Sequence, residues 1–257
     1  MLERVTAVRY AVPLREGGSL PGIVEASDDG TYVAKLRGAG QGLKVLVAEV
    51  IVGEIGRLLG VAVPRMVVLD LPRAIARYEA DEEVQDLLTA SIGDNLGVDY
   101  LPGSFGYDGS RPAAAEVAAP ILWLDAFTAN VDRTWANPNL LLWHREVWAI
   151  DHGAALYVHH AWARRAPDAA RFAALPFDAS EHVLAELVPA GQLAAQQERA
   201  AATLTEPALR AVVDLVPQEW LETSEALPTA DGVREAYVEH LRARLAAPQH
   251  WLPGGSS

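Results

Sequence analysis

The fold is decided by the stretch VDRTWANPN at residues 131–139, which is followed by IDHG at residues 150–153. Between them lie two apolar runs, separated by a short polar break at residues 144–146. Apolar runs on either side of a polar turn are typical of a β-hairpin. A hairpin here would turn the chain back on itself, so we expect it to place Asp151 beside the loop that contains residues 132–137.

Three polar residues in these stretches, Asp132, Asn137 and Asp151, carry oxygen atoms of the kind that Mg²⁺ prefers. The amide and one carboxylate could hold a metal ion, which leaves the other carboxylate to act as a base. Taken alone, this trio would suit many hydrolases as well as phosphotransferases. The remainder of the chain therefore has to distinguish between these classes.

The bulk composition narrows the class of protein. The chain has 257 residues, 51% of them hydrophobic, which is enough for one large domain or two lobes. With 34 acidic and 21 basic residues its net charge is −13, which disfavours nucleic acid and anionic membranes as partners but leaves ATP possible. The absence of cysteine excludes disulfides and thiol catalysis. We find neither a signal peptide nor an apolar run of about 18 residues, so we expect a soluble, cytoplasmic protein.

Residues 1–104 are predicted to form a small β-rich lobe. Asp29-Gly30 is typical of a tight hairpin turn between two strands. A helix is expected at 44–59, where apolar residues recur at helical spacing, and a helical insertion at 74–92. The strands are predicted at 5–12, 23–26, 31–36, 65–71 and 96–101.

Two features of this lobe could bind phosphate. The glycine-rich segment at 15–22 could cradle phosphates with its backbone N–H groups, or it could be an ordinary flexible loop. Lys35, one of two lysines in the chain, could point to solvent or reach the phosphates of ATP. Glu49 lies off the apolar stripe of the following helix and Glu54 lies on it. Either glutamate could pair with Lys35 or remain solvated.

The richest run of glycine and proline, around residues 105–112, is predicted to link the two lobes. The second lobe, 113–250, would begin with an apolar helix at 113–130 and continue through the hairpin. Residues 251–257 are expected to be a flexible tail. Further helices are predicted at 160–174, 180–187, 189–202, 205–214, 217–222 and 231–246, because these segments are rich in alanine and are separated by prolines.

The order of these parts is that of protein-kinase-like phosphotransferases: glycine-rich loop, strand lysine, helix glutamate, Asp-x4-Asn, hairpin, Asp-x-Gly. A narrower set of stretches comprises Gly17-Gly18-Ser19, YVAKL at 32–36, AE at 48–49, LGVAVP at 59–64, NLGVDYLPG at 95–103, DAFTANVDR at 125–133 and IDHGA at 150–154. In these stretches, over residues 15–160, the sequence resembles the HipA-like kinases.

The resemblance implies an α+β, two-lobed, protein-kinase-like fold with a small β-rich first lobe and a larger helical second lobe. It implies transfer of the γ-phosphate of ATP, with Mg²⁺, to a hydroxyl group of a protein Ser or Thr or of the chain itself. Asp132 would act as the base, and Asn137 and Asp151 would hold Mg²⁺. Lys35 would contact the α- and β-phosphates, and Glu49 would hold Lys35 in place.

The resemblance also assigns the remaining contacts to the nucleotide. Gly17, Gly18 and Ser19 would cover the phosphates, and Ser19 would be a candidate for regulatory phosphorylation. Asp99, Tyr100 and Leu101 would form the hinge against adenine. Because the chain starts close to its glycine-rich loop, it looks like a short form that lacks the extra N-terminal subdomain of the toxin members of the family.

Two residues depart from the protein-kinase pattern. Val131 precedes Asp132 where protein kinases have an orienting His, and His152 replaces the Phe of Asp-Phe-Gly. Neither change removes a phosphate- or metal-binding group. Trp135, inside the loop, could face the substrate.

Two alternatives to a protein kinase stay open. The first is a small-molecule kinase of the aminoglycoside-modifying type, which an acidic pocket for a cationic substrate would favour. The second is a non-catalytic nucleotide-binding regulatory module. ATP consumption by the wild type that is lost in Asp132→Ala would exclude this module. The identity of the hydroxyl acceptor is open, and no nucleic acid or membrane is expected as a partner.

Overall fold

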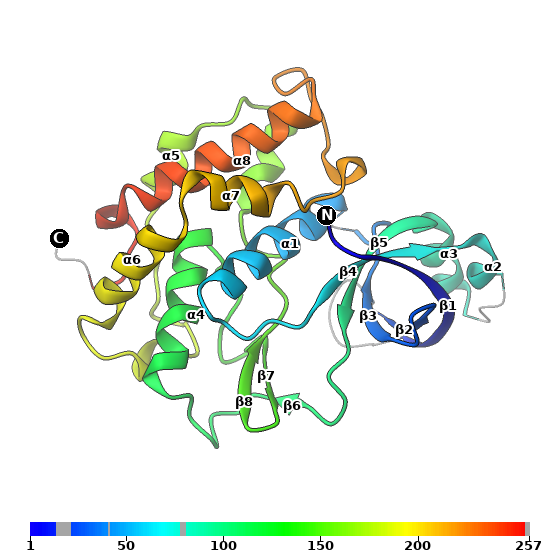
Figure 1. Cartoon of the computed structure of the whole chain (residues 1–257), viewed down its shortest axis with the longest axis horizontal. Helices are drawn as coiled ribbons and strands as arrows, with labels where there is room; N and C mark the ends of the chain where they lie inside the picture. Colours follow the sequence, from blue (N-terminus) through cyan, green and yellow to red (C-terminus); the bar gives the residue numbers. More distant parts are fainter. Residues whose placement is uncertain (14–21, 41, 78–80, 255–257) are drawn as a thin grey trace. The chain divides into compact units, whose positions relative to one another are not determined.

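The structure, a computed structural model, describes residues 1–13, 22–40, 42–77 and 81–254. It contains two compact units (Figure 1), of which the first comprises Met1–Leu46 and Pro64–Pro102 and the second Val47–Val63 and Gly103–Ser257. We call them the barrel unit and the helical unit. Their composition confirms the predicted α+β class. The predicted lobe limits, at 104 and 113, remain predictions.

Five strands of the barrel unit close into a β-barrel in the order β1-β2-β3-β5-β4. Neighbouring strands run antiparallel, except that β1 and β4 are parallel. All five predicted strands are confirmed. Their bounds are β1 (Arg4–Pro13), β2 (Gly22–Ala26), β3 (Thr31–Lys35), β4 (Met66–Leu71) and β5 (Gly93–Asp99).

The barrel is filled because its strands alternate between apolar and polar positions. On β3 the side chains of Tyr32 and Ala34 are fully buried in the barrel core, whereas Lys35 lies on the opposite face and is half-buried. Two helices, α2 (Arg73–Ala76) and α3 (Glu82–Ala90), add Ala76 and two residues of α3 to the same core. They form the predicted helical insertion.

Gly97 of β5 is required by close packing inside the barrel. A Cβ atom at this position would lie 2.8 Å from Cγ2 of Val67 and 3.4 Å from Cδ1 of Tyr32. We expect Gly97→Ala to lower the free energy of unfolding by about 1–3 kcal/mol, because the added methyl group overpacks the core. Urea unfolding measures this change. The matched control is Gly106→Ala, also on a strand, where a Cβ would meet nothing within 4 Å. Equal stability losses in both variants would contradict the prediction.

The helical unit is organised around α4 (Ala115–Thr128), in which every residue from Ala118 to Thr128 is buried. Helix α1 (Leu43–Leu58) crosses from one unit to the other and packs Gly56 against Leu124 of α4. A small sheet contains β6 (Phe105–Gly106), β7 (Leu140–Trp143) and β8 (Glu146–Ala149). The other helices are α5 (Ala169–Ala173), α6 (Gln192–Thr203), α7 (Glu206–Val213) and α8 (Ala230–Leu245), with short 3-10 turns at Tyr157–Ala163, Ala185–Leu187, Gln218–Trp220 and Pro248–His250.

Three predicted helices were wrong. The segment 160–174 is not one helix but a 3-10 turn followed by the short α5, because Pro167 between them has no N–H to donate. The segment 217–222 makes only a 3-10 turn. The segment 180–187 consists of turn residues on either side of His182, which pairs with Thr134 in an isolated antiparallel bridge, and the 3-10 turn at Ala185–Leu187. In the described part of the chain, no helix combines the length and the apolar character needed to cross a bilayer.

Arg244, near the end of α8, connects distant parts of the helical unit. Its buried guanidinium donates to the carbonyl oxygens of Phe172 (2.6 Å), Leu175 (2.9 Å) and Ala126 (2.7 Å). It also lies over the rings of Phe172 and Trp251. Burial lowers the pKa of Arg244 to about 10, so the side chain is still a cation at neutral pH. One side chain thus joins α4, the end of α5 and the end of α8.

Candidate active site

The loop that carries Asp132 starts from a fixed point at the end of α4. The helix ends where Ala129 adopts a left-handed conformation with φ 56° and ψ 41°. Asn130 then donates its amide Nδ2 to Oδ1 of Asp125 at 2.9 Å. The side-chain oxygen of Asn130 accepts the backbone N–H of Asp132 at 3.2 Å. The buried side chain of Asn130 therefore holds the backbone of Asp132 in place.

The carboxylate of Asp132 is held by two further amides. Asn137 donates from Nδ2 to Oδ2 of Asp132 at 2.8 Å, and Asn139 donates to the same oxygen at 3.3 Å. Both amides therefore bond the same oxygen of the Asp132 carboxylate, and the amide nitrogen of Asn137 faces Asp132. The structure thus brings Asp132 and Asn137 together.

The predicted hairpin is confirmed, and it returns the chain to this loop. Strands β7 and β8 are joined by His144 and Arg145, both at positive φ, as in a two-residue type I′ turn. At the open end, the N–H of Ile150 donates to the carbonyl of Asn139 at 3.0 Å. Asp151 follows directly and is exposed. The hairpin therefore brings Asp151 close to Asn139 in the loop.

Behind the loop lies a buried network that we call the Asp125 network: Asp125, Asn130, Arg133, His152 and His182. The Nε of Arg133 donates to Oδ2 of Asp125 at 2.5 Å, and His182 Nε2 lies 3.0 Å from the same oxygen. Arg133 also donates from Nη1 to the carbonyls of Asn139 and Ile150, and its Nη2 lies 3.3 Å from Nδ1 of His152. All five side chains are buried. One arginine thus fixes both ends of the hairpin.

The electrostatics of Asp125 follow from this network. Burial alone would raise the pKa of the carboxyl, but the charge of Arg133 and the hydrogen bond from His182 outweigh burial. They hold the pKa well below its ordinary value of 3.8. Asp125 is therefore ionised at any physiological pH, although no part of it reaches solvent.

A pH dependence of stability follows from the lowered pKa of Asp125. The unfolded chain takes up a proton at Asp125 near pH 3.8, whereas the folded protein resists it, so this contribution to stability is lost as the pH falls below about 4. We expect the difference in unfolding free energy between the wild type and Asp125→Asn to be constant above about pH 5 and to narrow below about pH 4. Urea unfolding at a series of pH values measures it. A difference that does not change with pH would contradict this assignment.

Backbone strain is concentrated around the same site. Four residues other than glycine have positive φ here: Ala129 (56°), Asn139 (48°), Asp151 (54°) and Leu156 (54°). Each such conformation costs about 1–3 kcal/mol and persists only where surrounding contacts enforce it. One such contact is the N–H of Leu156, which donates to the carbonyl of Thr128 at 2.8 Å. The backbone of Asp151 thus lies in the left-handed region, with φ 54°, directly after the hairpin.

Trp135, between Asp132 and Asn137, stays 59% exposed although it is well supported. Its ring stacks on Tyr107 with centroids 6.3 Å apart. It also covers Gly109, where a Cβ atom would lie only 2.8 Å from the indole. Tyr107 is itself fixed, because its hydroxyl accepts the N–H of Ala113 at 3.2 Å. The loop therefore presents a fixed aromatic surface to solvent.

The other predicted site residues lie elsewhere in the chain. Lys35 and the hinge residues Asp99, Tyr100 and Leu101 belong to the barrel unit, and Gly17, Gly18 and Ser19 lie outside the described residues. The backbone N–H groups of Asp99 and Tyr100 already donate to the carbonyls of Arg65 and Thr31.

The two candidate glutamates of α1 have different environments. Glu49 is 2% exposed. Glu54 pairs with Arg57 of the same helix at 3.1 Å. Glu49 is thus almost completely buried, whereas Glu54 has a cationic partner within its own helix.

Sequence reasoning missed the roles of Asp125 and His182. A carboxylate within the apolar run 113–130 was a usable signal, since a buried charge needs a partner. For His182 the sequence offers no such signal, because its contacts depend on tertiary structure.

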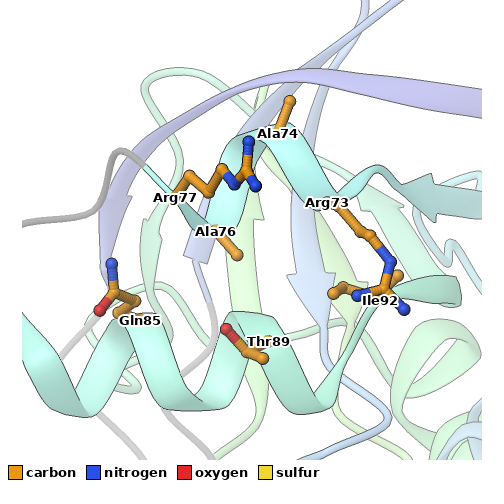
Figure 2. Close-up of a pocket in the computed structure, with 7 residues that line it drawn as sticks. All are labelled: Arg73, Ala74, Ala76, Arg77, Gln85, Thr89 and Ile92. Carbon is orange, nitrogen blue, oxygen red and sulfur yellow. The ribbon is translucent and has the colours of Figure 1, made fainter.

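The described residues contain no cluster of three or more His, Cys, Asp or Glu side chains suited to a metal ion. A Mg²⁺ site made by one carboxylate, one amide and substrate phosphates would not be of that kind. A groove of about 570 Å³ lies between α2 and α3 in the barrel unit and contains no predicted site residue (Figure 2). It is lined by Arg73, Ala74, Ala76, Arg77, Gln85, Thr89 and Ile92.

The fold and the order of its polar loops define a protein-kinase-like protein. A family model described as HipA-like kinase matches residues 8–253, so the chain belongs to the HipA-like kinase family and is a phosphotransferase of the kinase type. This confirms the resemblance found in the sequence. No curated protein matches the chain by sequence.

Of three similar solved structures, one kinase with a TM-score above 0.5 shares the fold, and the other two match with lower scores. The crystal structure of the Helicobacter pylori proinflammatory kinase CtkA is similar with a TM-score of 0.51 and 11% identity, covering 90% of this chain and 93% of that one. The Golgi casein kinase matches with a TM-score of 0.44 and 12% identity, covering all of this chain and 75% of that one. A structure of that kinase with Mn/ADP bound matches with a TM-score of 0.43 and 12% identity, covering 96% of this chain and 73% of that one.

Proposed function

We propose that the protein transfers the γ-phosphate of ATP, with Mg²⁺, to a hydroxyl group of a protein Ser or Thr or of its own chain. Membership of the HipA-like kinase family supports the class of reaction. The observation that carries the proposal is the arrangement of Asp132, in which two amides donate to one oxygen of its carboxylate. The hairpin that follows this loop returns the chain to Asn139 and leads into Asp151.

Asp132 is the proposed base. Its Oδ1 would accept or orient the proton of the attacking hydroxyl, while the amides of Asn137 and Asn139 keep Oδ2 in place. This arrangement positions the carboxylate before the substrate arrives, so little reorganisation is needed during the reaction. Positioning is the main catalytic resource in phosphoryl transfer, where few covalent steps involve the protein.

Asn137 and Asp151 are the proposed ligands of Mg²⁺. The donor set fits this ion, because the amide nitrogen of Asn137 faces Asp132 and its oxygen is thereby left for a cation. Asp151 supplies a carboxylate from an exposed position. When bound, Mg²⁺ offsets the negative charge of the phosphates.

The proposed contacts to the phosphates rest on the resemblance. Lys35 would contact the phosphates, Glu49 would hold Lys35, and Gly17, Gly18 and Ser19 would cover the phosphates. Among the predicted hinge residues, Leu101 is the proposed backbone donor to adenine, since the N–H groups of Asp99 and Tyr100 are already used within the barrel unit.

Trp135 is the proposed contact to the acceptor. Its exposed ring lies in the same short loop as Asp132, and Tyr107 supports it from behind. An apolar or planar group next to the acceptor hydroxyl could pack on this ring. We therefore expect Trp135 to influence the KM for the acceptor more than the KM for ATP.

Incubation of the wild type with γ-labelled ATP and Mg²⁺, followed by measurement of ADP and by mass spectrometry of the protein, tests the proposal. ADP formation that EDTA abolishes is the expected result. Phosphate on Ser19 would support the chain itself as an acceptor, and turnover only with an added aminoglycoside would favour the small-molecule alternative. The absence of both turnover and an ATP-dependent thermal shift would refute the proposed function.

A further inference from the structure

His182 lies in a segment that is paired with the loop of Asp132. Its backbone forms an antiparallel bridge with Thr134, and the next residue, Val183, donates its N–H to the carbonyl of Arg133 at 3.1 Å. The imidazole is almost completely buried, with its side chain 3% exposed. A segment far along the chain thus lines the inner side of the loop.

The two ring nitrogens of His182 have different and complementary partners. Nδ1 lies 3.1 Å from the backbone N–H of Leu184, which can only donate, so Nδ1 must accept. The neutral ring therefore carries its proton on Nε2. Nε2 lies 3.0 Å from Oδ2 of Asp125 and donates to it. The contact with Leu184 thereby fixes the tautomer that Asp125 requires.

Asp125 connects His182 to the loop of Asp132 and to the backbone before Asp151. Its Oδ1 accepts from Asn130, whose oxygen holds the backbone of Asp132. Its Oδ2 accepts from Arg133, which holds the carbonyl of Ile150, the residue before Asp151. Loss of the donor from His182 would leave an acceptor site of a fully buried carboxylate unsatisfied.

The position before Asp132 cannot supply such a constraint. It is occupied by Val131, which is 63% exposed and carries no hydrogen-bonding group. Within the Asp125 network, His182 is the side chain that reaches Asp125 from outside the stretch 125–152.

We propose that His182 is a positioning residue for phosphoryl transfer, acting through Asp125 on Asp132 and on the backbone before Asp151. His182 would orient the loop that contains Asp132 from a distant part of the chain, whereas the position directly before Asp132 is occupied by Val131 and not by a histidine. This inference rests on the proposed function, and it assigns no contact between His182 and the substrate.

Three substitutions separate the two ring nitrogens. His182→Gln can place an amide N–H₂ near the position of Nε2 and keep the donor to Asp125. His182→Asn can keep an acceptor for Leu184 but is too short to reach Asp125. His182→Leu keeps neither group. The matched control is His250→Leu, which removes an exposed histidine near the end of the described chain.

We expect the kcat for ATP turnover to fall about 10- to 100-fold in His182→Leu and His182→Asn, as for other residues that orient a primary ligand. The KM for ATP should change by less than about threefold, and His182→Gln should recover most of the lost activity. Measurements are made well below the unfolding temperature of each variant. Wild-type kcat in His182→Leu, or an equal loss in the Gln and Asn variants, would overturn the proposal.

Hydrogen exchange provides a second test that needs no catalysis. Amides in peptides covering residues 130–139 and 150–156 should exchange faster in the Leu and Asn variants than in the wild type, the Gln variant or the control. Unchanged exchange in His182→Leu would overturn the proposal. If the wild type does not turn over ATP, the proposed function fails, and the exchange measurement still decides whether His182 positions the loops.

Discussion

Asp132→Asn is expected to lower the rate of ATP-dependent phosphoryl transfer by about 10²- to 10⁴-fold, the range for loss of a general base. Asparagine has nearly the same size as aspartate, but it cannot accept the proton of the attacking hydroxyl. The two amides that now donate to the charged Oδ2 of Asp132 would instead face the neutral side chain of the asparagine. ADP formation under saturating ATP measures the loss.

The matched control for Asp132→Asn is Asp86→Asn, which changes an exposed aspartate on α3 of the barrel unit. The control should keep wild-type turnover, and both variants should keep the ATP-dependent thermal shift, because Asp132 isn't proposed to bind ATP. Turnover within about threefold of the wild type in Asp132→Asn would rule out Asp132 as the base.

Asp125→Asn is expected to lower the free energy of unfolding by about 3–5 kcal/mol at neutral pH, the usual cost of removing one partner of a buried ion pair. The guanidinium of Arg133 is fully buried and would lose its counter-charge. The carbonyl groups that Arg133 also contacts are dipoles and cannot replace a negative charge. Urea unfolding, followed by far-ultraviolet circular dichroism, measures the change.

Asp214→Asn is the matched control for this loss of stability. Asp214 pairs with Arg234 at 3.7 Å, but its side chain is 58% exposed. Solvent screens such pairs, so we expect a change of at most about 1 kcal/mol. A loss in Asp125→Asn no larger than in Asp214→Asn would show that the Asp125 network doesn't support the fold as we infer.

Much of the fold was predictable from local patterns in the sequence. The hairpin that leads to Asp151 was predictable because a two-residue turn joins two short apolar strands, and alternation along β3 placed Lys35 opposite the barrel core. Helix α8 followed from a long alanine-rich run without proline. In each case the residues that determine the element lie within the element itself.

The predictions failed where structure depends on distant partners. The segment 180–187 has helix-forming residues, but pairing with Thr134 and two ring contacts hold His182 in an isolated bridge between turns. The same long-range pairing explains why the sequence gave no reason to select His182. Asp132 and Asn137 were found because their spacing is local, whereas the side chains that orient them come from α4 and from beyond α5.

Arg244 has a consequence for the order in which the protein folds during synthesis. The carbonyl of Ala126 in α4 receives its donor from a residue 118 positions later, so α4 and the loop of Asp132 leave the ribosome long before Arg244 does. Until α8 emerges, the ends of α4 and α5 lack this cation. A chain truncated after Ala243 should therefore be cleaved faster by protease in residues 115–175 than one ending at Leu252, and equal cleavage would contradict this.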